Sequence, residues 1–288
     1  MKQQELEHRI EKYLKRQFGI TIKSASKRQV YEALMSTVRE KLSEKKFAYE
    51  QELKKTKQKR AYYMSMEFLV GRTLRNNLFN LGVEKEIKEY LSDNNFDLDE
   101  IYDIEPDPGL GNGGLGRLAS CYLDALTSSD YPVTGFSILY EYGIFKQVIN
   151  NGWQQEFPDY WLDLGKYGLV YRNDEEIEVR FYGHVEEKMT EDGFKVEHKD
   201  YTSIQAEPYD LLISGYKTKT VNTLRLWEAK AKTGFNMKLF ERGEYSKSSE
   251  AEAIASSISK LLYPADSTNE GKELRIKQQY FFISASLQ

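Results

Sequence analysis

The chain has 288 residues, and its 41 lysines and arginines against 45 aspartates and glutamates give a net charge of −4. That balance creates no single-signed field that would attract nucleic acid or an anionic membrane. The one cysteine, Cys121, excludes an intrachain disulfide framework and a cysteine-based zinc cluster, and three scattered histidines argue against a histidine metal site. The charged N-terminal stretch is unlike a signal peptide, and no apolar run is long enough to span a bilayer. We therefore expect a soluble, cytoplasmic protein.

The first part of the chain predicts helices. Leu6, Ile10 and Leu14 recur four residues apart, and Gly19 offers a stop. A second apolar stripe at helical spacing runs through residues 30–42, with charged residues on the other faces.

A basic run at 54–60 predicts a solvated connector. The apolar stretch 61–68 after it reads as a buried strand that carries a single acid, Glu67, and helical spacing returns between residues 74 and 91. We therefore divide the chain into an amino-terminal helical segment, 1–60, and an α/β domain, 61–288.

Five glycines then stand close together, directly before a helical period: Gly109, Gly111, Gly113, Gly114 and Gly116. A helix that starts here points unpaired N–H groups and its positive dipole end at an anion, and the absence of side chains lets that anion approach closely. The spacing is neither a P-loop nor a clean dinucleotide fingerprint. A phosphate- or sugar-binding loop is favoured over the alternative, a tight turn with close helix packing.

The side chains around this loop are expected to serve the fold rather than catalysis. Arg117 lies in the first helical turn, where the dipole disfavours a cation. A buried acid or a bound phosphate would compensate, and the structural ion pair is favoured. Glu67 is expected to be a paired core residue rather than a catalytic acid. Leu118 and Tyr122 set the helical period, and Cys121 is expected to pack on the apolar side of this helix.

The middle of the chain predicts strands. Residues 133–142 are strand-like, and Asn151-Gly152 suits a two-residue type I′ turn in a hairpin over 145–157. Alternating segments at 177–186 and 194–206 flank a turn at 191–193, and residues 221–231 read as a strand or a short helix. Together with the helices, these elements predict an α/β fold with a mixed sheet and a β-rich insertion near 145–220.

Two helices are predicted near the end of the sequence, one over 248–262, before Pro264, and one over 272–288. The second has no glycine, asparagine or proline to stop it. The expectation is that the chain is part of a longer protein.

Several blocks of sequence, in order, resemble the amino-terminal domain of glycogen (α-1,4-glucan) phosphorylases: residues 62–78, 105–124, 140–145, 151–154, 208–216, 221–231 and 262–282. The similarity covers nearly the whole chain from Tyr62. It implies the amino-terminal Rossmann-like half of a glycosyltransferase-B-type fold. It also implies a homodimeric enzyme that cleaves glycogen or maltodextrin with inorganic phosphate to give glucose 1-phosphate. Pyridoxal phosphate is the cofactor that the family uses, and the lysine motif that holds it does not occur in this sequence. We therefore expect the chain alone to be inactive.

The resemblance also implies site residues. Gly113, Gly114 and Leu115 match the loop that lines the phosphate and sugar sites, and Gly114 is also implied as a cofactor-binding residue. Asp266 matches an acid in the loop that gates the catalytic cleft, and Ser267 replaces the asparagine with which many relatives contact the sugar.

The same resemblance bears on assembly and regulation. The segment 248–262 matches one that packs across the family's dimer interface, whereas regulation by AMP or phosphorylation has no support. Two other classes remain open: a non-catalytic glycan-binding or dimerisation module, and half of a nucleotide-sugar glycosyltransferase.

Overall fold

The structure, a computed structural model, describes residues 3–191 and 193–288, and the chain folds into two compact units. The first unit holds the described residues up to Val170 together with Tyr209–Leu226, and the second holds Tyr171–Pro208 and Trp227–Gln288. Within the described residues, no helix is both long and apolar enough to cross a membrane. The division at residue 60 predicted from the sequence stays a prediction.

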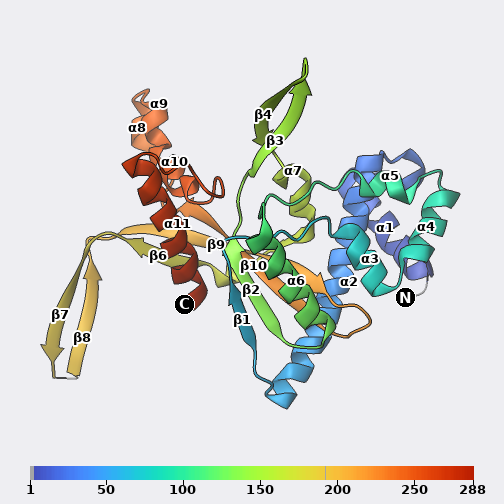
Figure 1. The fold of residues 1–288 in the computed structure, drawn as a ribbon, viewed down its shortest axis with the longest axis horizontal. Helices are drawn as coiled ribbons and strands as arrows, with labels where there is room; N and C mark the ends of the chain where they lie inside the picture. The colour runs from blue at the N-terminus through green and yellow to red at the C-terminus, as the bar shows by residue number, and fades with distance from the viewer. Residues whose placement is uncertain (1–2, 192) are drawn as a thin grey trace. The chain divides into compact units, whose positions relative to one another are not determined.

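The first unit combines a group of helices with strands. Its elements are α1 (Gln3–Phe18), η1 (Ile22–Ser24), α2 (Lys27–Thr56), β1 (Ala61–Met64), α3 (Leu74–Leu81), α4 (Glu84–Asp93), α5 (Leu98–Tyr102), α6 (Gly114–Ser128), β2 (Val133–Ile138), β3 (Gly143–Asn150), β4 (Trp153–Asp159), α7 (Leu162–Gly165) and η2 (Lys166–Gly168), and β5 (Leu169–Tyr171) begins in it. Helices α1, α3 and α5 pack against α2, and α4 packs against α1, α3 and α5 (Figure 1). Residues of these helices form one continuous apolar cluster.

The second unit is smaller and begins with strands. Its elements are η3 (Asn173–Glu175), β6 (Ile177–Phe181), β7 (His184–Thr190), β8 (Gly193–Lys199), α8 (Met237–Glu241), α9 (Tyr245–Ser248), α10 (Glu250–Ser257) and α11 (Asn269–Leu287). Strands β9 (Thr202–Ser214) and β10 (Val221–Ala231) contribute residues to both units. Helix α11 packs against β6.

The main sheet is mixed. Its strand order is β1-β2-β10-β9-β5, with β6 paired to β9. Strands β1 and β2 are parallel, whereas β6 and β9 are antiparallel, which confirms an α/β fold with a mixed sheet. Helix α6 packs against β2 (Figure 1). The prediction of a strand over 61–68 is only partly right, because β1 ends at Met64 and the following residues are irregular.

Two antiparallel ribbons, β3–β4 and β7–β8, form separate two-stranded sheets, and each projects from its own unit (Figure 1). In the β3–β4 turn, Asn151 has φ +51° and Gly152 has φ +80°, as a type I′ turn requires, so the predicted hairpin is confirmed. The strands predicted over 177–186 and 194–206 are only partly right, because each is interrupted: β6 and β7 divide the first, and β8 and β9 divide the second. Asp192 of the predicted turn lies outside the described residues.

Of four further predictions, two need correction. The basic run 54–60 is exposed as predicted, but it is not all connector, because α2 continues through Thr56. The helix predicted over 248–262 is broken, since α10 ends at Ser257. Residues 221–231 are a strand, β10, and the last predicted helix is confirmed as α11.

Helix α2 begins with a capping box. The Ser26 Oγ accepts a hydrogen bond from the Gln29 N–H at 3.3 Å, and the Gln29 Oε1 accepts one from the Ser26 N–H at 2.8 Å. Both groups would otherwise lack partners at the helix start. We expect Ser26→Ala to lower the free energy of unfolding by about 1 kcal/mol in chemical denaturation. Ser43→Ala, which removes an exposed hydroxyl from the middle of the same helix, is the control. Equal effects of the two substitutions would contradict the capping role.

Candidate functional site

The glycine-rich loop 109–116 leads into α6, as the sequence predicted, and its glycines are of two kinds. Gly109 and Gly116 are tightly packed. An alanine Cβ at Gly109 would lie 2.6 Å from the Gly143 Cα and 2.6 Å from Trp161, and one at Gly116 would lie 2.9 Å from the Glu67 side chain. These glycines are required because other parts of the chain approach them closely.

Gly113 and Gly114 are the opposite kind. No atom lies within 4 Å of the position that a Cβ would take at either residue. Gly113 is the N-cap of α6 with extended backbone, and no side chain caps this end. Across residues 3–191 and 193–288, the N–H groups of Gly113, Gly114 and Leu115 have no hydrogen-bond acceptor. The helix therefore begins with unused donors, its positive dipole end and open space, which together suit an anion.

The segment 67–69 holds this loop at three points. The Phe68 N–H donates to the Leu110 carbonyl at 2.8 Å, and the Leu69 N–H donates to the Gly116 carbonyl at 3.0 Å. Between them, the Glu67 Oε2 accepts a hydrogen bond from the Asn112 N–H at 3.1 Å. Glu67 is only 3% exposed, so the prediction of a paired core residue is confirmed. Its carboxylate lies beside the open helix start and fixes the residue directly before Gly113.

Two predictions about α6 itself are wrong. Arg117 forms no ion pair with a described residue, and its Nη1 donates to the Leu69 carbonyl at 3.4 Å. Cys121 is exposed, and Leu118 and Tyr122 are about half exposed. The buried face carries smaller groups: Gly116, Ala119, Ser120, Leu123 and Thr127. Small side chains let α6 approach the sheet closely, which turns the larger apolar side chains outward.

Glu105, which was not identified as important from the sequence, fixes the start of helix α3. It is 4% exposed, and its carboxylate accepts hydrogen bonds from the N–H groups of Thr73 and Leu74 and from the Thr73 Oγ1, at 2.7–2.9 Å. Glu105 thereby caps α3 from a distance of 31 residues along the chain. The signal in the sequence was weak, because α3 has no acidic or hydroxyl cap of its own that bonds to it.

Burial raises the pKa of Glu105, although the backbone N–H groups of Thr73 and Leu74 act in the opposite direction. A raised pKa in the folded state means that this group favours folding most below its unfolded pKa, and that the contribution is lost as the pH rises through the folded value. We expect the unfolding free energy of the wild type minus that of Glu105→Gln to fall as the pH rises above 4.5. Denaturant unfolding of both proteins across this range measures it. A difference that grows with pH would show that the hydrogen bonds outweigh burial.

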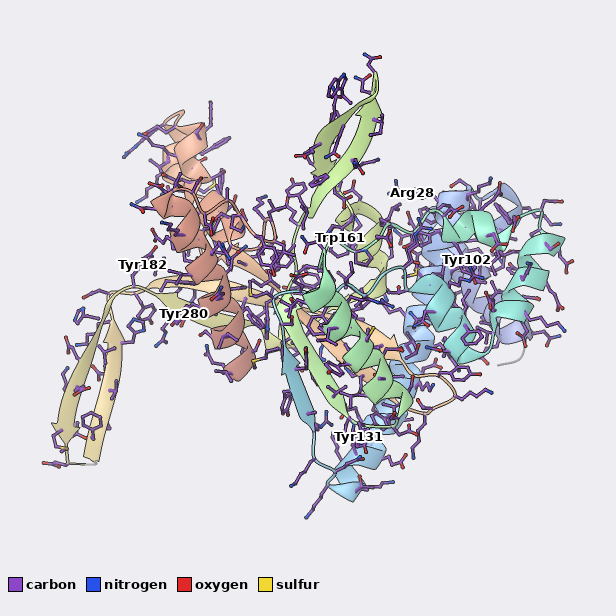
Figure 2. The ribbon with its side chains drawn as sticks, in the orientation of Figure 1. Arg28, Tyr102, Tyr131, Trp161, Tyr182 and Tyr280 are labelled. Carbon is purple, nitrogen blue, oxygen red and sulfur yellow. The ribbon has the colours of Figure 1, made fainter. Side chains whose placement is uncertain are left out.

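A buried aromatic pair supports the loop from the other side. Trp161, 2% exposed, lies where β4 ends and α7 begins (Figure 2), and its Nε1 donates to the Tyr140 carbonyl at 3.0 Å. The Tyr140 hydroxyl in turn donates to the Met66 carbonyl at 2.9 Å. The Trp161 ring also packs against Gly109. Sequence reasoning used Tyr140 only as part of a motif and missed this support.

Asp266 and Ser267 belong to the second unit, whereas Gly113, Gly114 and Leu115 belong to the first. Both residues lie in the segment before α11, in exposed positions, and Asp266 forms an ion pair with Arg275 of that helix. Thr268, the next residue, caps α11 by accepting a hydrogen bond from the Gly271 N–H at 3.2 Å. The helix therefore anchors Asp266 within its own unit. The roles of these five residues stay predictions.

The chain is similar in sequence to several proteins of known function. The sequence profile of the carbohydrate phosphorylase family matches residues 91–288. Glycogen phosphorylase of Chlamydia pneumoniae is 44% identical over 266 residues, which cover 92% of this chain and 32% of the relative. The brain and muscle forms of human glycogen phosphorylase are each 44% identical over 264 residues, which cover 92% of this chain and 31% of either relative. The chain thus spans about a third of the length of the curated relatives it matches. The profile covers most of the chain and includes the glycine-rich loop 109–116 at the start of α6. The chain therefore belongs to the carbohydrate phosphorylase family.

Proposed function

We propose that this chain supplies part of the catalytic site of a glucan phosphorylase. The reaction is the cleavage of terminal α-1,4-glucosyl units of glycogen or maltodextrin by inorganic phosphate, which gives glucose 1-phosphate. The observation that carries the proposal is the start of α6, which is open and has unused N–H donors. The buried Glu67 fixes it by accepting a hydrogen bond from the Asn112 N–H. Family membership supports it independently, because relatives named glycogen phosphorylase share 44% of the aligned residues.

In this proposal the three residues at the helix start have defined tasks. The N–H groups of Gly113, Gly114 and Leu115 bind oxygen atoms of phosphate or sugar, and the helix dipole adds to their attraction for negative charge. These donors are preorganised, since the contacts of residues 67–69 fix the loop before any ligand arrives. A preorganised donor stabilises charge that develops in a transition state without the cost of reorientation.

The family's cofactor, pyridoxal phosphate, also fits this donor set. Gly114 offers an unused N–H and has no atom within 4 Å of its Cβ position, so a phosphate group can approach its backbone. When bound, the cofactor supplies a phosphate group that takes part in proton transfer with the substrate phosphate. The residues of this chain contribute binding and orientation through Gly114.

The finer architecture and the partners belong to the same proposal. The parallel strands β1 and β2, with α6 packed on β2, support the amino-terminal Rossmann-like half of a glycosyltransferase-B-type fold. Asp266 and Ser267 are further residues that would contact substrate in this proposal. The family also suggests a homodimer with the segment 248–262 at its interface, and Ile254 in α10 is 58% exposed, as such a contact surface requires.

The test is phosphorolysis by the complete protein, the product of the whole gene. Incubation with glycogen, inorganic phosphate and pyridoxal phosphate is expected to release glucose 1-phosphate. The 288-residue chain alone is expected to release none, because it lacks the family's cofactor lysine motif and so cannot assemble the site. A complete protein that binds pyridoxal phosphate but yields no glucose 1-phosphate from either glycogen or maltodextrin would refute the proposal.

A further inference from the structure

A cavity that is lined by Arg117 but by none of the loop residues 109–116 has no part in the function proposed above. Its volume is about 290 Å³, enough for roughly ten water molecules at about 30 Å³ each. It is lined by residues of α3, α6, the end of β9 and the loop before α3, all within the first unit. Helices and a strand therefore build most of its wall, so its shape does not depend on a long flexible loop.

Asn77 is the buried polar group of this cavity. It is 5% exposed, and its Oδ1 accepts a hydrogen bond from the Ser214 hydroxyl at 2.7 Å. That hydroxyl itself accepts a hydrogen bond from the Asn80 Nδ2 at 3.1 Å, so its own proton is free to go to Asn77. This arrangement fixes the orientation of the Asn77 amide. Its Nδ2 is left with no partner among the described residues, in a side chain that lines the cavity.

Two charged side chains of α6 line the same cavity. Arg117 uses one nitrogen for the long contact to the Leu69 carbonyl, and neither Arg117 nor Asp124 forms an ion pair with a described residue. They are seven residues apart, which places them on one face of the helix about 10.5 Å apart along its axis. The cavity therefore has a cation and an unused amide donor among its lining groups, and a carboxylate two helical turns from the cation.

We propose that this cavity binds a small phosphorylated polyol. A guanidinium holds a phosphate through two parallel hydrogen bonds, so the oxyanion is bound by Arg117 with the Asn77 amide as a further donor. The Asp124 carboxylate accepts hydrogen bonds from hydroxyl groups at the other end of the ligand. The distance of two helical turns keeps the phosphate away from this acid. A free oxyanion would use only the Arg117 end, and an uncharged polyol only the Asp124 end.

The experiment is calorimetric titration of the full chain with three probes: sorbitol 6-phosphate, inorganic phosphate and sorbitol. Sorbitol 6-phosphate is expected to bind most tightly, inorganic phosphate more weakly, and sorbitol most weakly. Arg117→Gln is expected to weaken the binding of sorbitol 6-phosphate roughly tenfold or more, since it removes a charge-assisted pair of hydrogen bonds. Asp124→Asn is expected to weaken sorbitol 6-phosphate but not inorganic phosphate.

Two further variants separate this site from its alternatives. Asn77→Asp keeps the acceptor for Ser214 and replaces the free amide by a carboxylate oxygen, so it should repel the phosphate while the protein stays folded. Gly114→Ala alters the start of α6 and should leave this binding unchanged. Arg75→Gln, on α3 but outside the cavity lining, is the control. If Gly114→Ala abolishes binding and Arg117→Gln does not, the phosphate binds at the glycine-rich loop and the proposal is wrong. Equal affinity for inorganic phosphate and sorbitol 6-phosphate would likewise overturn it.

Discussion

Gly109→Ala is expected to destabilise the protein by about 1–3 kcal/mol, the usual cost of forcing extra volume into a packed interior. The new Cβ would lie 2.6 Å from the Gly143 Cα and 2.6 Å from a carbon of the Trp161 ring. Neither neighbour moves easily. Gly143 begins β3, and the buried Trp161 is held by its hydrogen bond to the Tyr140 carbonyl. Denaturant unfolding monitored by tryptophan fluorescence measures the loss.

Gly113→Ala is the matched control for this prediction. It adds the same methyl group to the same loop, but no atom lies within 4 Å of the new position, and the extended backbone at φ −150° accepts any residue. Its effect on unfolding should stay within about 0.5 kcal/mol. Substitution of these two glycines would then have different effects on stability because only Gly109 is closely surrounded by other atoms. If both substitutions destabilise the protein equally, the loop depends on glycine for backbone freedom rather than for space.

The sequence predicted that a helix begins at this loop, because a run of glycines before a helical period is a local signal. It could not separate the tightly packed glycines from the open ones. That difference depends on residues 67–69, which contact the loop from more than 40 positions earlier, and on Trp161, which contacts Gly109 from 52 positions later. Local patterns carry no information about such contacts. For the same reason the distant cap that Glu105 provides for α3 was missed.

The errors on α6 have a different physical origin. This helix has two apolar faces, one of small residues and one of large residues, and hydrophobic periodicity alone favours the large ones. The structure buries Gly116, Ala119 and Leu123 and leaves Leu118 and Tyr122 half exposed. Close approach of the helix to β2 decides between the faces. Cys121 follows the exposed face, and it therefore lines a cavity instead of packing in the core.

Gly114→Ala in the complete protein is expected to lower turnover with glycogen about 10²–10³-fold, the typical cost of losing one preorganised donor to a developing anion. The added methyl group would enter the open space in front of the helix start, where the proposed function requires an oxyanion to approach the backbone. Stability should change little or rise slightly. No neighbour is displaced, and alanine is the better helix former by roughly 1 kcal/mol in a helix interior.

The control for Gly114→Ala is Ala125→Gly, which removes a methyl group from an exposed position near the other end of α6. It should produce the opposite pattern, with unchanged turnover and an unfolding free energy lower by up to about 1 kcal/mol. Initial rates of glucose 1-phosphate release and denaturant midpoints of both variants decide the matter. Near-normal turnover in Gly114→Ala, with a clear fall in its denaturant midpoint, would mean that the open glycine serves the fold and that the helix start does not bind the reacting phosphate. A large fall in turnover at an unchanged midpoint would place the N–H groups of α6 in the reaction itself. Ala125→Gly also changes α6 by one methyl group, but at a position that no anion has to approach.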